Sequence, residues 1–92
     1  MDTITPEQCR AARAMLGWSQ QSLADASGVG VVTIRQFEIG ASTPRNATVQ
    51  VLRLALEAAG VVFVADGEQA DGGAGVRLRS AQADLGSIVG NG

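Results

Sequence analysis

The chain has 92 residues, 46% of them hydrophobic and only three of them aromatic, which suffices for one small domain with a largely aliphatic core. The net charge is −2, and the absence of histidine together with a single cysteine, Cys9, excludes zinc-finger ligands, an internal disulfide bond and a histidine-based catalytic triad. The longest apolar run, residues 61–65, is too short to span a bilayer, and residues 1–5 lack the features of a signal peptide. We therefore expect a cytoplasmic protein that is not an enzyme and has no metal, cofactor or membrane partner.

The first helix is predicted from a complete start signal. Thr5 suits the N-cap, Pro6 the first helical position, and Gln8 the third position, where it completes a capping box. Gly17 ends the helix. Apolar residues lie between these ends at helical spacing, namely Cys9, Ala12 and Leu16.

Two short helices are predicted next. Ser19 caps a helix that runs to about residue 26 and stops at Gly28, and a further helix covers about residues 31–39 before Gly40. The apolar positions placed to close on one another are Leu23, Ala24, Val29, Ile34 and Phe37. Two short helices joined by a tight glycine turn are the pattern of a helix-turn-helix, in which the second helix enters the major groove of DNA.

A fourth helix is predicted after the loop at residues 41–44. It starts from a cap at Asn46 or Arg45 and runs to about residue 59. Its inner apolar stripe consists of Val49, Leu52, Ala55 and Leu56. The pattern predicts a mainly α fold of four to five helices, which the next segment extends with a β-hairpin.

The hairpin is predicted from two strand patterns. Residues 61–65 are β-branched and aromatic, residues 76–79 alternate apolar residues with arginine, and the loop between them is rich in Gly and Asp. Two strands alone are marginal in water, so they must pack on the helices or pair with a second chain. We interpret residues 1–60 as a helix-turn-helix domain, 61–79 as a hairpin extension that serves dimerisation, and 80–92 as a flexible tail.

Charge is distributed unevenly over these parts. Residues 10–53 contain five arginines and two acidic residues, a balance of +3, whereas residues 54–92 contain two arginines and five acidic residues, a balance of −3. The basic part coincides with the helix-turn-helix pattern. Five arginines give only weak non-specific attraction to phosphates, so specific contacts or dimerisation would have to supply more of the affinity.

Several spaced positions agree at once with one known family. They are Leu16-Gly17-Trp18-Ser19-Gln20, Leu23-Ala24, Gly28-Val29, Thr33-Ile34, Glu38-Ile39-Gly40 and Pro44. Over roughly residues 8–60 the chain resembles the Cro/CI-type, Xre-like helix-turn-helix family of phage and bacterial repressors. The resemblance implies a compact helical domain that binds a near-palindromic operator in double-stranded DNA as a homodimer, without catalysis.

The resemblance also implies roles for particular residues. Gln20 matches a family residue whose side chain touches a DNA phosphate and braces the helix that enters the major groove. It stands at a helix N-terminus, which favours an anion. Arg13 and Glu38 match a largely buried ion pair between the first and third helices. The loop and helix start that follow lie along the sugar-phosphate backbone in the family. Here they contain Thr43, Arg45 and Asn46.

The third helix is expected to read bases with its outward face. Arg35 can bind guanine, Gln36 can bind adenine, and Val31 and Val32 can contact thymine methyl groups. Gly30 stands where the family often has a capping Ser or Thr, and Val31 and Val32 stand where polar base readers are common. Readout here would therefore be partly apolar and would depend partly on DNA shape. The expected DNA-binding residues are Gln20, Gly30, Val31, Val32, Thr33, Arg35, Gln36, Thr43, Arg45 and Asn46.

Two other functions are compatible with the same residues. An antitoxin would regulate its own operon through the helices and hold a toxin or other protein partner through residues 61–92. A protein-interaction module would keep the fold without DNA binding, and the acidic overall charge favours it. A neighbouring toxin-like reading frame would favour the antitoxin, and DNA binding that does not respond to salt would favour the interaction module.

Overall fold

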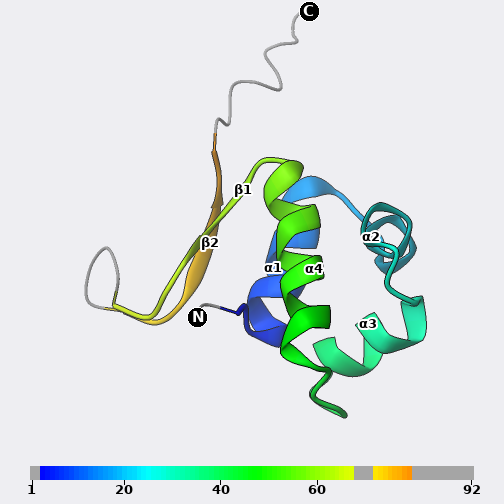
Figure 1. Cartoon of the computed structure of the whole chain (residues 1–92). Coiled ribbons are helices and arrows are strands. Elements are labelled where there is room, and N and C mark those ends of the chain that lie inside the picture. Colours follow the sequence, from blue (N-terminus) through cyan, green and yellow to red (C-terminus); the bar gives the residue numbers. More distant parts are fainter. Residues whose placement is uncertain (1–2, 68–71, 80–92) are drawn as a thin grey trace, which may run out of the picture.

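The computed structural model describes residues 3–67 and 72–79, which form four helices and a two-stranded hairpin (Figure 1). The predicted mainly α fold with a C-terminal hairpin is confirmed. The elements are α1 (Pro6–Leu16), α2 (Gln20–Ser27), α3 (Val31–Glu38), α4 (Asn46–Ala58), β1 (Val61–Val64) and β2 (Gly75–Leu78). The tail expected at residues 80–92 lies outside the described residues. No helix in the described part of the chain is both long and apolar enough to cross a bilayer.

The ends of the first two helices follow the local signals in the sequence. Thr5 accepts a hydrogen bond from the backbone N–H of Gln8, whose side chain accepts one from the N–H of Thr5. Ser19 caps α2 by accepting from the N–H of Ser22. Gly17 closes α1 in the left-handed conformation, with φ of 71°, which a residue without Cβ adopts at little cost.

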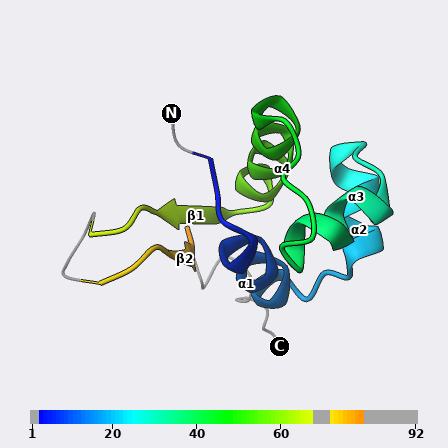
Figure 2. The ribbon, with the colours of Figure 1, turned by 90° about the horizontal axis from the view of Figure 1, so that it is seen from below.

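The core lies where all the described elements meet. Leu23, Ile34, Leu52, Leu56 and Val61 are completely buried, and they come from α2, α3, α4 and β1. Both views show α1 and α4 in the middle of the molecule, with α2 and α3 on one side and the hairpin on the other (Figures 1 and 2). The face of α3 that points away from the core is therefore remote from the hairpin.

The hairpin packs on the helices of its own chain, which is one of the two arrangements expected for so small a sheet. Its strands are antiparallel, with Val61 opposite Leu78 and Phe63 opposite Val76. Val61 and Phe63 belong to the core. The side-chain amide of Gln8 donates to the carbonyl oxygens of Val64 and Gly75, at 3.1 and 2.9 Å, and so joins α1 to both strands.

Candidate nucleic-acid interface

The α2–α3 pair is held rigidly against the core by its buried residues. Gly28 ends α2 in the left-handed conformation, with φ of 78°, and turns the chain into α3. Leu23 on α2 and Ile34 on α3 are completely buried, and Phe37 is nearly so. Figure 2 shows the two helices side by side at one end of the molecule, so that α3 presents its opposite face to solvent.

The outward face of α3 combines exposed apolar and polar side chains. Val32 is 50% exposed, and Ile39, the residue that ends the helix, is 69% exposed. Arg35 and Gln36 are also exposed. Exposed aliphatic residues beside an arginine and a glutamine match what the major groove offers, because thymine methyl groups lie there next to hydrogen-bonding base edges.

The first residues of α3 divide between this face and the core. Val31 is half-buried and packs against the core, because it lies one helical turn before the buried Ile34. Of the two valines expected to meet thymine methyl groups, only Val32 therefore stands clear of the protein. Thr33 is half-buried, whereas Gly30 is exposed.

The helix N-termini differ in capping, and the uncapped ones flank this face. Thr5 and Ser19 cap α1 and α2 with their side chains, whereas Gly30 and Arg45 begin α3 and α4 without a side-chain hydrogen bond. An uncapped helix start presents free N–H groups and the positive end of the helix dipole to an anion such as a phosphate. These two starts lie at the N-terminal end of α3 and after the loop that follows it. The nearby residues expected to bind DNA are exposed, namely Thr43, Arg45 and Asn46.

Glu38, at the end of α3, is the centre of a buried polar cluster that also contains Cys9, Arg13 and Gln20. Its side chain is 1% exposed and forms an ion pair with Arg13 at 2.7 Å, between Nη2 and Oε1. A second bond, from Arg13 Nε to Oε2 at 2.8 Å, makes the pair bidentate. Gln20 Nε2 donates to Oε1 at 3.0 Å, and Cys9 Sγ donates to Oε2 at 3.1 Å.

The cluster determines the protonation of its members. Burial raises the pKa of Glu38, but hydrogen bonds from Arg13, Gln20 and Cys9 and the charge of Arg13 outweigh this and hold that pKa below its ordinary value. Burial, the hydrogen bond to Glu38 and the charge of Glu38 raise the pKa of the Cys9 thiol far above its ordinary value. The carboxylate therefore stays charged and the thiol stays a hydrogen-bond donor.

Two arginines of α1 extend the cluster to the backbone. Arg13 Nη1 donates to the carbonyl oxygen of Trp18 at 3.0 Å, in the turn before α2. Arg10 donates to the backbone carbonyl of Glu38, at the C-terminal end of α3, where a cation is favoured by the helix dipole. The position and tilt of α3 thus depend on side chains from α1 and α2.

The structure adds partners to several residues that sequence reasoning had treated separately. The Arg13–Glu38 pair expected from the resemblance is present, but the hydrogen bonds from Cys9 and Arg10 were not expected. The four-residue spacing of Cys9 and Arg13 places them on one face of α1 and was the available signal. Gln20, expected at a phosphate, donates to Glu38 while its residue remains half-exposed.

Acid should destabilise the fold through this cluster. Because the pKa of Glu38 is lower in the folded chain, its contribution to stability is complete above the pKa in the unfolded chain. It is lost as pH falls through the folded-state pKa. Thermal melting from about pH 7 to about pH 2 should therefore show a steeper acid loss for the wild type than for Glu38→Gln, which cannot titrate there. Parallel profiles would show that Glu38 does not contribute.

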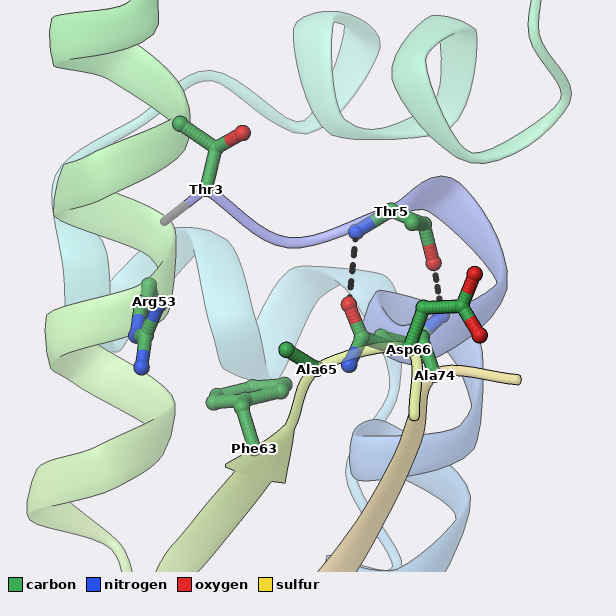
Figure 3. Close-up of a pocket in the computed structure, with 8 residues that line it drawn as sticks. Thr3, Thr5, Arg53, Phe63, Ala65, Asp66 and Ala74 are labelled. Carbon is green, nitrogen blue, oxygen red and sulfur yellow. Dashed lines mark hydrogen bonds between the residues drawn. The ribbon is translucent and has the colours of Figure 1, made fainter. Parts of the chain in front are cut away.

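Away from α3, a hollow of about 230 Å³ lies between the residues that precede α1, the helix α4 and the hairpin (Figure 3). On one side the guanidinium carbon of Arg53 lies 5.6 Å from the centre of the Phe63 ring. Arg53 also pairs with Glu57 at 2.8 Å, and Thr5 and Gln8 bond each other across the capping box. These groups connect the hairpin to the helices, on the side of the molecule away from α3.

A comparison with protein families supports the interpretation of the α2–α3 unit. A family model described as helix-turn-helix, of the Cro/C1-type and Xre-like kind, matches residues 10–61. The match covers the C-terminal part of α1, all of α2, α3 and α4, and the first residue of β1. A search of curated proteins gave no match.

Proposed function

The chain belongs to the Cro/C1-type helix-turn-helix family of DNA-binding domains, and from that premise we propose that it is a sequence-specific transcriptional repressor that binds its operator as a homodimer. In this proposal α3 lies in the major groove, and Arg35 and Gln36 read base edges. Val32 meets a thymine methyl group beside them. Regulation would follow from occupancy of the promoter, because binding there excludes other proteins.

The observation that carries the proposal is the outward face of α3. It combines Val32, Arg35 and Gln36 on a helix that is fixed by the buried ion pair of Glu38. On either side are uncapped helix N-termini suited to phosphates. Phosphate contacts there, with Gln20, Thr33, Thr43 and Arg45 among them, would fix the register of α3 without reading sequence.

Selection of bound duplexes from a random library tests this function. We expect a near-palindromic sequence with half-sites about 34 Å apart, one turn of the DNA helix. Affinity should fall with rising salt, but shallowly, because residues 10–53 contain only five arginines and no lysine. Recovery of no common sequence, with affinity independent of salt, would contradict the proposal and favour a protein-interaction module.

The antitoxin alternative would place a toxin on residues 61–92. Residues 80–92 of that segment lie outside the described part of the chain, and the buried face of the hairpin packs on the helices. None of the described contacts favours a toxin over a repressor's own second copy. We therefore keep the repressor as the proposed function.

A further inference from the structure

The outer face of α4 is apolar although no described element covers it. Val51 is 41% exposed and Leu54 is 54% exposed, and they lie directly opposite the buried residues of the helix. Ala47 and Ala58 continue the same exposed line. These four residues are called the α4 stripe below.

The α4 stripe lacks the charged side chains that normally occupy the solvent-facing side of a surface helix. The charged residues of α4 are Arg53 and Glu57, which pair with each other at 2.8 Å on the flank that faces the hairpin. Gln50, also beside the stripe, has a buried side-chain oxygen with no hydrogen-bond partner among the described residues. A helix that is apolar on both its inner and outer faces is typical of one that is buried on both.

The order of residues in the stripe suits a second copy of the chain. The positions 47, 51, 54 and 58 are spaced by four, three and four residues, which is the spacing of a two-helix seam. Along the stripe the side chains are small, large, large and small, so their sizes follow the same order from either end of the helix. An antiparallel copy would therefore place Ala47 against Ala58 and Val51 against Leu54, as a two-fold interface requires.

We propose that the α4 stripe is the contact surface for a second copy of this chain, with the two α4 helices antiparallel about a two-fold axis. This deepens the proposed function by naming the surface of the homodimer. It differs from dimerisation through the hairpin, whose inner face is already filled by the core. No charged residue of α4 lies on the stripe, so the pairing brings no like charges together.

The size of the surface predicts a weak dimer. A helix of 13 residues is about 20 Å long, and one face of it is smaller than the roughly 800 Å² per partner of a stable interface. Free chains should therefore exist in a monomer–dimer equilibrium. Two adjacent half-sites would raise the effective concentration of the second chain and complete the dimer.

Sedimentation equilibrium without DNA tests the surface. Leu54→Glu places a charge at the centre of the stripe and should raise the dimer dissociation constant by about tenfold or more. Met15→Glu is the matched control, because Met15 is a 41% exposed apolar residue of α1. Since both residues are exposed, both variants should fold. A wild type without a dimer, or equal dimerisation of Leu54→Glu and wild type, would overturn the proposal.

Disulfide trapping tests the antiparallel arrangement. A mixture of Ala47→Cys and Ala58→Cys chains should form a mixed disulfide dimer on oxidation, because these positions meet across the axis. Either variant alone should not, since its two cysteines would lie about 16 Å apart along the helices, beyond the reach of a disulfide. Cys9 is completely buried and does not compete. Self-crosslinking of each variant as fast as the mixture would overturn the arrangement. Neither result tests whether the chain binds DNA, so the proposed function is judged separately.

Discussion

Replacement of Glu38 by alanine is expected to lower the free energy of unfolding by roughly 3–5 kcal/mol, as the loss of one partner from a buried ion pair does. The carboxylate accepts four hydrogen bonds, two from Arg13 and one each from Gln20 and Cys9. Without it, Arg13 keeps a charge in a site that is mostly shielded from water. The whole free energy of unfolding of a native protein is about 5–15 kcal/mol, so this loss is large.

Urea denaturation of three variants would distinguish the loss of the buried ion pair from the loss of any acidic side chain. Glu57→Ala breaks the pair between neighbouring turns of α4 and should cost no more than about 1 kcal/mol, because the side chain of Glu57 is 32% exposed whereas that of Glu38 is 1% exposed. Arg13→Met combined with Glu38→Leu removes both charges, and it should recover much of the stability lost in Glu38→Ala. A loss in Glu38→Ala no larger than in Glu57→Ala would contradict the assigned role.

Features that depend on a few neighbouring residues could be predicted from the sequence. The capping box of Thr5 and Gln8 and the cap at Ser19 involve residues three apart, so their spacing alone specifies the hydrogen bonds. Gly17 and Gly28 were predicted as helix ends, and both adopt the left-handed conformation that favours glycine. The sequence allows either Arg45 or Asn46 as the cap of α4, and the structure has Arg45 there.

Features that depend on distant residues could not be predicted in the same way. The amide of Gln8 was expected only in the capping box, but it also bonds two strand carbonyls that lie 56 and 67 positions away. Cys9 belongs to the apolar positions predicted for the first helix, and it is completely buried, but that pattern does not indicate its hydrogen bond to Glu38. Spacing tells which face of a helix is buried, but which polar groups meet there depends on how the helices cross.

The candidate interface shows the same division. Helical spacing placed Val32, Arg35 and Gln36 on the outward face of α3, and all three are exposed. Val31 was offered to DNA because an apolar side chain suits a thymine methyl group, whereas the structure packs it against the core. Its place three residues before Ile34 puts it on the buried side of α3. Helical spacing thus indicates the inward position of Val31, which the chemistry of its side chain alone does not.

Simultaneous replacement of Arg35 and Gln36 by alanine is expected to abolish discrimination between operator and random DNA while leaving the fold intact. Both side chains are exposed on α3, so their removal leaves no cavity in the core. Each good base contact contributes about 1–3 kcal/mol of discrimination. The ratio of operator to random-sequence affinity should therefore fall on the order of a hundredfold or more. Melting temperature and secondary structure should match the wild type.

The control must remove the same charge from a surface that faces away from DNA. Arg77→Ala does so, because Arg77 is exposed on β2, and the hairpin lies on the opposite side of α1 and α4 from α3 (Figure 1). Competition binding with operator and random duplexes at two salt concentrations then distinguishes the roles. A phosphate contact weakens both duplexes equally, whereas a base contact weakens the operator more. If the double variant binds both duplexes with the wild-type ratio, α3 does not read sequence through Arg35 and Gln36.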